Sequence, residues 1–163
     1  MPRNKMPQGP GAARSGRARY RGSVQRPALE LVTQRLIVQV PPVSVAPRML
    51  DYCRRNRAHL GPWEPRRPDE YFTKAFWVRQ LAGAREEYEA GRSARTVLLR
   101  RDPGAQRNGR DGRVVGVVNL SQIVRGAFQA AVLGYSLDAD AEGEGLMTEA
   151  LSALVTHAFE EMG

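Results

Sequence analysis

One segment near residue 140 constrains the fold of this chain more than any other. Residues 134–138 have the composition of a strand, residues 139–145 form a short acidic loop that contains Gly143 and Gly145, and residues 146–159 carry apolar side chains at helical spacing. Glycines at the start of a helix let backbone N–H groups approach a ligand closely, and the helix dipole favours an anion there. The segment therefore predicts a strand, a phosphate-binding loop and an amphipathic helix.

The residues around these glycines exclude two other phosphate-binding motifs. A P-loop needs a lysine directly after its second glycine, and Leu146 occupies that position. A dinucleotide-binding fingerprint needs a third small residue and an acidic residue about 20 positions further on, which would lie beyond residue 163. The loop therefore predicts a phosphate site of another kind.

The composition fits one globular domain without a membrane span, a disulfide or a metal site. The chain has 163 residues, of which 42% are hydrophobic, and no apolar run approaches the ~20 residues that a transmembrane helix requires. No apolar stretch that could act as a signal peptide opens the sequence, so we expect a cytoplasmic protein. Cys53 is the single cysteine and His59 and His157 are the only histidines, so we expect no metal site and a buried, inert thiol at Cys53.

Positive charge is concentrated in residues 1–26. This segment holds seven of the 25 Lys and Arg residues and no Asp or Glu, so it carries seven of the eight net positive charges. It is rich in Gly and Pro and poor in apolar residues, which predicts a disordered basic tail in front of a folded domain over residues 27–163. Weak attraction to a polyanion such as ribosomal RNA, a solvated extension and a start codon assigned too early all remain open for the tail.

Hydrophobic periodicity predicts one strand, two helices and then three antiparallel strands before the glycine loop. We expect a single strand over residues 29–40, helices over 46–57 and 73–91, and strands over 94–101, 113–124 and 130–137. An irregular loop with Gly61 and two prolines separates the helices, and a hairpin loop over 102–112 follows the second strand. Gly116 and Gly134 lie inside strands, where a glycine predicts a bulge or a close approach to the backbone.

Five short segments follow one another in a recognisable order. They are Thr33-x-Arg35-Leu36, Asn56-Arg57-x-His59-Leu60-x-Pro62-Trp63, Gly116-x-Val118-Asn119-Leu120-Ser121, Gly134-Tyr135-Ser136-Leu137-Asp138 and Gly143-x-Gly145-Leu146-Met147-Thr148-Glu149-Ala150. In this order they resemble the GNAT superfamily of acetyl-coenzyme A-dependent N-acetyltransferases, and within it the RimJ/RimL-type branch that acetylates the amino termini of ribosomal proteins. The resemblance covers residues 29–163 and implies an α/β (α+β) fold with a mixed, mainly antiparallel sheet flanked by helices.

The resemblance also implies that residues 1–163 hold only part of this fold. Members of the family continue past the helix that follows the loop, into a further strand, a helix and a hairpin. These elements complete the cofactor channel and commonly supply the group that protonates the leaving thiolate. We therefore expect a truncated acetyltransferase that lacks the C-terminal strands and exposes a strand edge, and we assign no catalytic acid or base.

The resemblance assigns the glycine loop to the pyrophosphate of acetyl-coenzyme A and the strand before it to the pantetheine arm. The implied cofactor-binding residues, mainly through backbone groups, are Ser136, Leu137, Asp138, Gly143, Glu144, Gly145, Leu146, Met147 and Thr148. The family loop is Q/R-x-x-G-x-G/A, whereas Asp140 stands at the first position here, and Glu142 and Glu144 flank the glycines. Acids beside a pyrophosphate weaken binding unless they face water, so we expect backbone N–H groups to bind it. Both a hydroxyl contact and a purely helical role remain open for Thr148.

Five residues are candidates for the acceptor site. His59, Leu60 and Trp63 match the family segment that contacts the acceptor, and Asn119 and Ser121 lie on a strand expected to face the same site. Each also has a structural interpretation, such as packing of Trp63 or capping by His59. The resemblance implies acetyl transfer to an amine, foremost the N-terminal α-amine of a ribosomal protein. The alternatives are an inactive remnant that binds RNA or the ribosome, and an acetyltransferase for a small-molecule amine.

Overall fold

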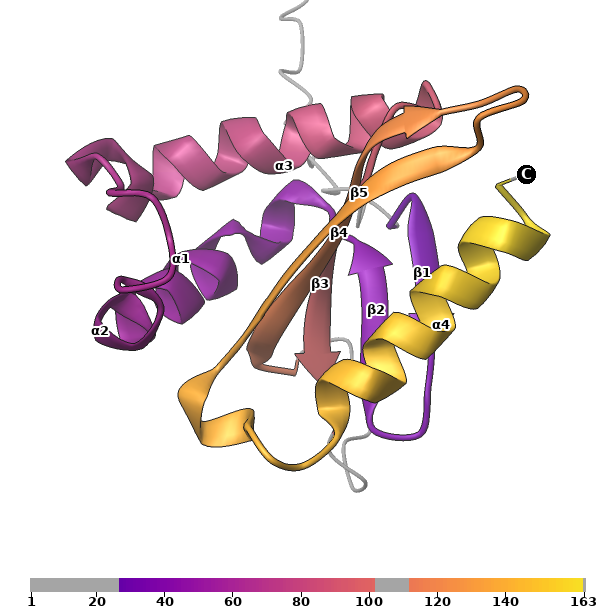
Figure 1. The fold of residues 1–163 in the computed structure, drawn as a ribbon. Coiled ribbons are helices and arrows are strands. Elements are labelled where there is room, and N and C mark those ends of the chain that lie inside the picture. The colour runs from indigo at the N-terminus through magenta and orange to yellow at the C-terminus, as the bar shows by residue number, and fades with distance from the viewer. Residues whose placement is uncertain (1–26, 102–111, 163) are drawn as a thin grey trace, which may run out of the picture.

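The computed structural model describes residues 27–101 and 112–162 (Figure 1). Its strands are β1 (Leu29–Val32), β2 (Leu36–Val40), β3 (Ala94–Arg100), β4 (Val114–Val124) and β5 (Ala130–Leu137). Its helices are α1 (Ala46–Arg55), α2 (Arg57–Leu60), α3 (Lys74–Glu89) and α4 (Leu146–Glu160), with short 3-10 turns η1 (Val43–Val45), η2 (Asp69–Phe72) and η3 (Ala139–Ala141). The predicted basic tail over residues 1–26 and residues 102–111 of the predicted hairpin loop lie outside the described residues.

The five strands form one antiparallel sheet in the order β1-β2-β3-β4-β5, so each strand pairs with its neighbour along the chain. Helix α4 covers one face of the sheet, and α1 and α3 cover the other (Figure 1). Strand β5 stands at one edge, where Val132, Leu133 and Tyr135 are exposed. The predicted α/β (α+β) fold, with a mainly antiparallel sheet flanked by helices, is confirmed.

Apolar residues along the strands fill two separate cores, one on each face of the sheet. On β2, Ile37 packs in the core beneath α1 and α3, whereas Leu36 and Val38 pack in the core beneath α4. This division follows from strand geometry, because successive side chains point to opposite faces. Strand β2 is buried along its whole length as a result, and each of its apolar side chains contributes roughly 1.5–3 kcal/mol when it is buried fully.

The prediction of one strand over residues 29–40 is wrong, because β1 and β2 are separate strands joined by a tight turn. The N–H of Thr33 donates to the carbonyl of Leu36 at 2.9 Å, and the N–H of Leu36 donates to Oγ1 of Thr33 at 3.0 Å. These bonds close the turn, and β1 then pairs antiparallel with β2. Apolar residues continue on both sides of the turn, so hydrophobicity alone does not reveal it.

Helix α1 ends at Arg55, two residues before the predicted boundary, because Asn56 leaves the helical path. Asn56 has φ of −96° and ψ of 9°, and its buried side chain donates from Nδ2 to the carbonyl of Tyr52 at 3.0 Å. The short helix α2 follows, within the segment predicted as an irregular loop. Helix α3 starts where predicted, because Oγ1 of Thr73 accepts a hydrogen bond from the N–H of Phe76 at 3.3 Å and caps it.

Gly116 is a point of close approach within the sheet. A Cβ atom at this position would lie 2.7 Å from the carbonyl oxygen of Ser136 on β5. Opposite Gly116, the pairing of β3 with β4 shifts register between Leu98 and Leu99. The predicted bulge or close approach is therefore confirmed at Gly116. At Gly134, by contrast, a Cβ atom would meet nothing within 4 Å.

Candidate functional site

The loop before α4 has the local geometry of an anion-binding site. Gly143 and Gly145 both have φ of +74°, a left-handed conformation that favours glycine, and Gly145 is the N-cap of α4. The N–H groups of the first helical turn, at Leu146, Met147 and Thr148, have no acceptor within the helix. The Leu146 side chain is fully buried, which fixes the start of the helix. These N–H groups and the helix dipole are therefore suited to a phosphate.

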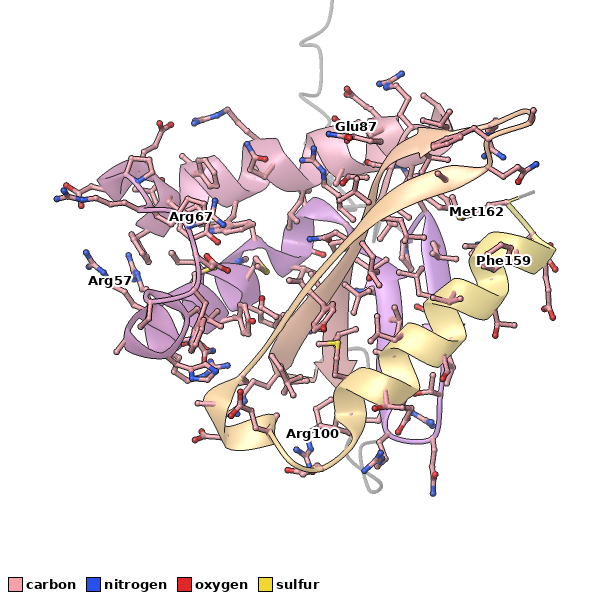
Figure 2. All side chains as sticks on the ribbon, viewed as in Figure 1. Arg57, Arg67, Glu87, Arg100, Phe159 and Met162 are labelled. Carbon is pink, nitrogen blue, oxygen red and sulfur yellow. The ribbon has the colours of Figure 1, made fainter. Side chains whose placement is uncertain are left out.

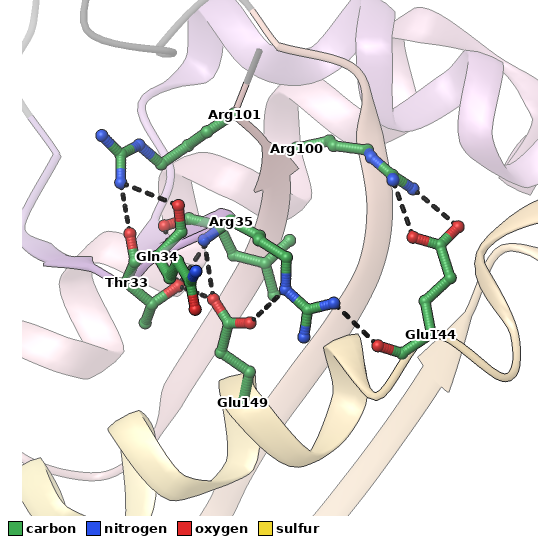
Figure 3. Close-up of polar contacts among 8 residues, drawn as sticks. Thr33, Gln34, Arg35, Arg100, Arg101, Glu144 and Glu149 are labelled. Atoms are coloured by element: carbon green, nitrogen blue, oxygen red, sulfur yellow. Dashed lines mark hydrogen bonds and ion pairs between the residues drawn. The ribbon is translucent and has the colours of Figure 1, made fainter. Parts of the chain in front are cut away.

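The turn between β1 and β2 clamps this loop from one side (Figure 3). Arg35 donates from Nε to Oε2 of Glu149 at 2.7 Å and from Nη1 to the carbonyl of Glu144 at 2.8 Å. Its backbone N–H and the Thr33 hydroxyl donate to Oε1 of Glu149 at 2.8 and 2.6 Å. Partial burial raises the pKa of Glu149, but these hydrogen bonds outweigh burial and the pKa lies below its ordinary value. A charged Glu149 thus ties the first turn of α4 to the β1–β2 turn.

The acidic residues beside the glycines have partners within the protein. Arg100 donates to both carboxylate oxygens of Glu144, at 3.1 and 2.7 Å, and lowers the pKa of this residue (Figure 3). Oε1 of Glu142 lies 3.2 Å from Nε2 of His59, and Asp140 lies 3.6 Å from Arg113. All three acids are also exposed, and Arg100 and Arg113 offset part of the negative charge that would oppose a phosphate.

A buried carboxylate fixes the end of β5. Asp138 is 2% exposed, and its Oδ2 accepts from Nη2 of Arg55 at 2.7 Å and lies 3.0 Å from Nη2 of Arg113. Burial raises the pKa of Asp138, but the contacts with these two arginines outweigh burial and the pKa lies below its ordinary value. Its N–H donates to the carbonyl of Val115 at 2.7 Å. Its carbonyl accepts from the N–H of Ala141 at 2.9 Å, so a ligand could contact Asp138 only at the second lone pair of this carbonyl oxygen.

The other predicted cofactor residues on β5 point to opposite faces of the sheet. Ser136 faces α1, where its Oγ lies 3.0 Å from the hydroxyl oxygen of Tyr52, and Leu137 packs against the core beneath α4. In the part of the chain that the structure describes, β5 pairs only with β4, so the backbone groups on its outer edge are not used by the sheet. An extended ligand could pair with this edge through backbone hydrogen bonds.

A pocket of about 760 Å³ lies beside β5, on the face of the sheet that carries α1 and α3. One wall is aromatic, with Tyr71, Phe72, Phe76 and Trp77 from η2 and α3, and residues 134–136 of β5 contribute to the lining. Tyr71 packs edge-to-face against Phe72 and Trp77, with ring centroids 5.3 and 5.0 Å apart. The pocket, of a size typical for ligand sites, thus connects an aromatic wall to β5.

The structure brings two of the five predicted acceptor residues to this pocket. Leu60 and Asn119 line it. His59 instead contacts Glu142 of the glycine loop, and Trp63 is 85% exposed and does not contribute to the lining. Ser121 lies further along β4, with its Oγ 3.4 Å from the carbonyl of Val132.

Two tyrosine hydroxyls beside this pocket were not predicted from the sequence. The hydroxyl of Tyr52 faces Ser136, and the hydroxyl of Tyr71 lies 3.6 Å from Sγ of Cys53. Burial raises the pKa of both tyrosines, so both stay protonated at neutral pH, and it raises the pKa of Cys53 to about 11. Cys53 is buried as predicted. The helical spacing of Trp77 indicated a core position and could not reveal that the same side chain lines a cavity.

Two other kinds of site are absent from the described part of the chain. Within residues 27–101 and 112–162, no group of three or more His, Cys, Asp and Glu side chains could hold a metal ion. None of the helices in these ranges is long and apolar enough to cross a membrane.

Comparisons with known proteins point to one family. Residues 35–163 match the family described as Acetyltransferase (GNAT) domain. The chain is 36% identical to the ribosomal protein uS5-alanine N-acetyltransferase of Escherichia coli over 138 residues, which cover 85% of this chain and 66% of that protein. Its fold is similar to that of a ribosomal-protein-S5-alanine acetyltransferase from Vibrio fischeri, with a TM-score of 0.71, 28% identity and coverage of 81% of this chain and 68% of the other. It also resembles Mycobacterium smegmatis RimJ in complex with CoA-disulfide, with a TM-score of 0.64, 23% identity and coverage of 77% and 56%.

Proposed function

The chain belongs to the family of acetyltransferase (GNAT) domains, and we propose that it transfers an acetyl group from acetyl-coenzyme A to the N-terminal α-amine of a protein. The acceptor in this proposal is a ribosomal protein, because the relative from Escherichia coli is named for an alanine of ribosomal protein uS5. The observation that carries the proposal is the left-handed glycine pair at the start of α4, directly after an edge strand that borders a pocket. We place the reaction in the cytoplasm. The chain spans 66% of the length of that relative.

The residues around the glycine loop fit acetyl-coenzyme A. The N–H groups of residues 143–148 would hold its pyrophosphate, and the outer edge of β5 at Ser136, Leu137 and Asp138 would hold its pantetheine arm. A Cβ atom at Gly134 or Gly143 would meet nothing within 4 Å, so space is available at both ends of this path. Bound there, the cofactor would supply an acetyl thioester whose carbonyl carbon an amine can attack.

The pocket side of β5 would hold the acceptor amine. An N-terminal amine must lose its proton before it attacks, and the apolar wall around Trp77 favours the neutral form because it replaces water. Leu60 and Asn119 line the pocket and would contact the first residues of the acceptor. Tyr52 keeps its proton, and its hydroxyl oxygen lies 3.0 Å from Oγ of Ser136, so this pair presents a hydrogen-bond donor beside β5.

The basic N-terminal segment has a separate place in the proposal. Residues 27–163 form the acetyltransferase domain, and residues 1–26 add a weak contact with ribosomal RNA through their seven cationic side chains. RNA binding should weaken steeply as salt increases and should fall when residues 1–26 are deleted. If the full and the shortened chain bind RNA equally, residues 1–26 do not contribute to RNA binding.

Calorimetry with acetyl-coenzyme A tests the proposed cofactor site. We expect Gly145→Val to weaken binding by about tenfold or more, because a β-branched residue at φ of +74° displaces the first-turn N–H groups. Gly126→Val is the matched control, since Gly126 has φ of +82° in the turn between β4 and β5, at the opposite end of β5 from this loop, and a Cβ atom there meets nothing within 4 Å. Absence of binding to the unmodified chain, or equal binding by the Gly145 and Gly126 variants, would contradict the proposal.

A further inference from the structure

The charged residues that line the acceptor pocket are mostly arginines. Arg57, Arg66, Arg67 and Arg95 line it, against Glu64 and Asp69. Residues 27–163 as a whole are nearly balanced, because seven of the 25 Lys and Arg residues precede them and 18 remain against 17 Asp and Glu. We propose that the pocket selects polypeptide acceptors with acidic side chains close behind the N-terminal amine. This inference rests on the proposed function, since it takes the pocket as the acceptor site.

Two of the four arginines have no carboxylate partner within residues 27–101 and 112–162. Arg67 donates from Nε and Nη2 to Glu64 at 3.1 and 3.0 Å, and Arg95 lies 3.2 Å from Glu87. Arg57 and Arg66 are exposed, and neither forms an ion pair with any residue in these ranges. Their positive charge is therefore not neutralised by the protein around the pocket and can attract an anionic ligand.

Arg57 is also restrained by an aromatic ring. Its guanidinium carbon lies 4.6 Å from the centroid of the Phe72 ring, and that of Arg67 lies 4.8 Å from the centroid of Tyr71. Figure 2 shows Arg57 and Arg67 on the same side of the molecule, whereas Arg100 lies beside the loop before α4. A guanidinium that stacks on a ring loses less freedom on binding, and the N–H groups at its edge can donate to a carboxylate.

The arrangement of the pocket determines which part of an acceptor meets these arginines. The buried ring of Trp77 and the residues of β5 form its inner part, where the amine would react, and the exposed Arg57 and Arg66 form its rim. A polypeptide that enters with its N-terminus first places the side chains of its next residues at this rim. Carboxylates there gain charge-assisted hydrogen bonds, whereas cationic side chains are repelled.

Fluorescence anisotropy with labelled peptides tests the proposal on the full chain. Three peptides begin with alanine, carry the label at the C-terminus and differ only at the third and fourth residues, which are Asp, Asn or Lys. We expect the Asp peptide to bind about three- to tenfold more tightly than the Asn peptide at low salt, and the Lys peptide to bind most weakly. The preference should shrink as salt screens the charges.

A charge-reversal variant separates recognition from folding. Arg57→Glu combined with Arg66→Glu should reverse the order, so that the Lys peptide binds more tightly than the Asp peptide, which loss of structure cannot produce. Arg92→Glu is the control, because Arg92 is exposed and does not line the pocket, and it should keep the original order. Equal affinity of the unmodified chain for the three peptides, absence of binding, or an unchanged order in the double variant would overturn the proposal.

Two further outcomes are distinguished by the same measurements. Displacement of the Asp peptide by an equal concentration of free aspartate would also overturn the proposal, since the carboxylate would then belong to a small molecule. Peptide binding is measured without acetyl-coenzyme A. A chain that prefers the Asp peptide but does not bind acetyl-coenzyme A would therefore contradict the proposed acetyl transfer and leave the acidic preference of the pocket standing.

Discussion

The side chain of Asn56 joins the end of α1 to the start of the glycine loop. Its Oδ1 accepts from the N–H of Ala139 at 3.1 Å, and its Nδ2 donates to the carbonyl of Tyr52 at 3.0 Å. Asn56 is 1% exposed, so water cannot replace its side chain as a partner without a rearrangement. One amide thus links the helix that borders the acceptor pocket to the segment proposed to bind the cofactor.

Replacement of Asn56 should therefore destabilise the fold. Asn56→Ala leaves the N–H of Ala139 without its acceptor and removes one of the two donors to the carbonyl of Tyr52, which also accepts from the N–H of residue 56. We therefore expect the free energy of unfolding to fall by about 1–3 kcal/mol. Urea denaturation followed by circular dichroism measures this. Asn119→Ala, which changes a partly buried asparagine of β4, is the control and should shift stability by about 0.5 kcal/mol or less. If Asn56→Ala lowers the free energy of unfolding no more than the control does, the Asn56 side chain does not stabilise the link between α1 and the glycine loop.

Arg35 should affect cofactor binding through its hold on the loop. Arg35→Lys keeps the charge, but a lysine cannot reach both the Glu149 carboxylate and the Glu144 carbonyl as the guanidinium does (Figure 3). We expect the affinity for acetyl-coenzyme A, measured by calorimetry, to fall about tenfold. Arg101→Lys is the control, because Arg101 contacts the carbonyls of Thr33 and Gln34 in the same turn. If both variants lose the same affinity for acetyl-coenzyme A, the β1–β2 turn as a whole determines binding, and the contacts of Arg35 with Glu149 and Glu144 do not.

The buried carboxylate of Asp138 should make stability depend on pH in the acid range. Its pKa in the folded state lies below the ordinary value of 3.8, so the stabilisation is complete above that value and is lost as the pH falls through the lower folded-state pKa. Asp138→Asn should cost about 1–3 kcal/mol at pH 7, and this difference should shrink below pH 3.8. Denaturation at a series of pH values measures it.

Asp51→Asn provides the comparison for this prediction. Asp51 pairs with the same Arg55, but its side chain is 66% exposed, so we expect its loss to change stability by no more than about 1 kcal/mol at any pH. If Asp138→Asn and Asp51→Asn lower the free energy of unfolding equally at pH 7, burial does not determine how strongly the Asp138 contact stabilises the fold.

Two glycines in neighbouring strands should respond differently to the same substitution. Gly116→Ala places a Cβ atom 2.7 Å from the carbonyl oxygen of Ser136 and 3.0 Å from Cδ1 of Leu98, so we expect a loss of about 1–3 kcal/mol. Gly134→Ala meets nothing within 4 Å and should leave the stability unchanged, although it narrows the pocket wall. Thermal unfolding of both variants checks this. Comparable losses would mean that the close approach at Gly116 is not a constraint.

Local patterns were sufficient to predict most elements of the fold. Strands β4 and β5 begin and end within one residue of the predicted bounds, and α3 begins at its Thr73 cap, because long apolar periodicity and capping are encoded in adjacent residues. The glycine pair before α4 was predictable for the same reason. The turn at Thr33 was not, since apolar residues flank it on both sides and its hydrogen bonds involve only four residues.

Contacts between distant residues could not be predicted in the same way. Arg35 and Glu149 are 114 positions apart, and Arg55 and Asp138 are 83 apart, so nothing in the neighbourhood of either arginine identifies its partner. Likewise, helical spacing cannot distinguish a Trp77 that only fills a core from one that also lines a pocket.

Tandem mass spectrometry of a peptide incubated with this chain and acetyl-coenzyme A tests the proposed activity most directly. The peptide begins with alanine, carries two aspartates behind it and contains one internal lysine. We predict that the acetyl group is found on the α-amine of the alanine, and that the modification is lost with Gly145→Val but retained with Gly126→Val. An unmodified peptide, or an acetyl group on the lysine alone, would contradict the account.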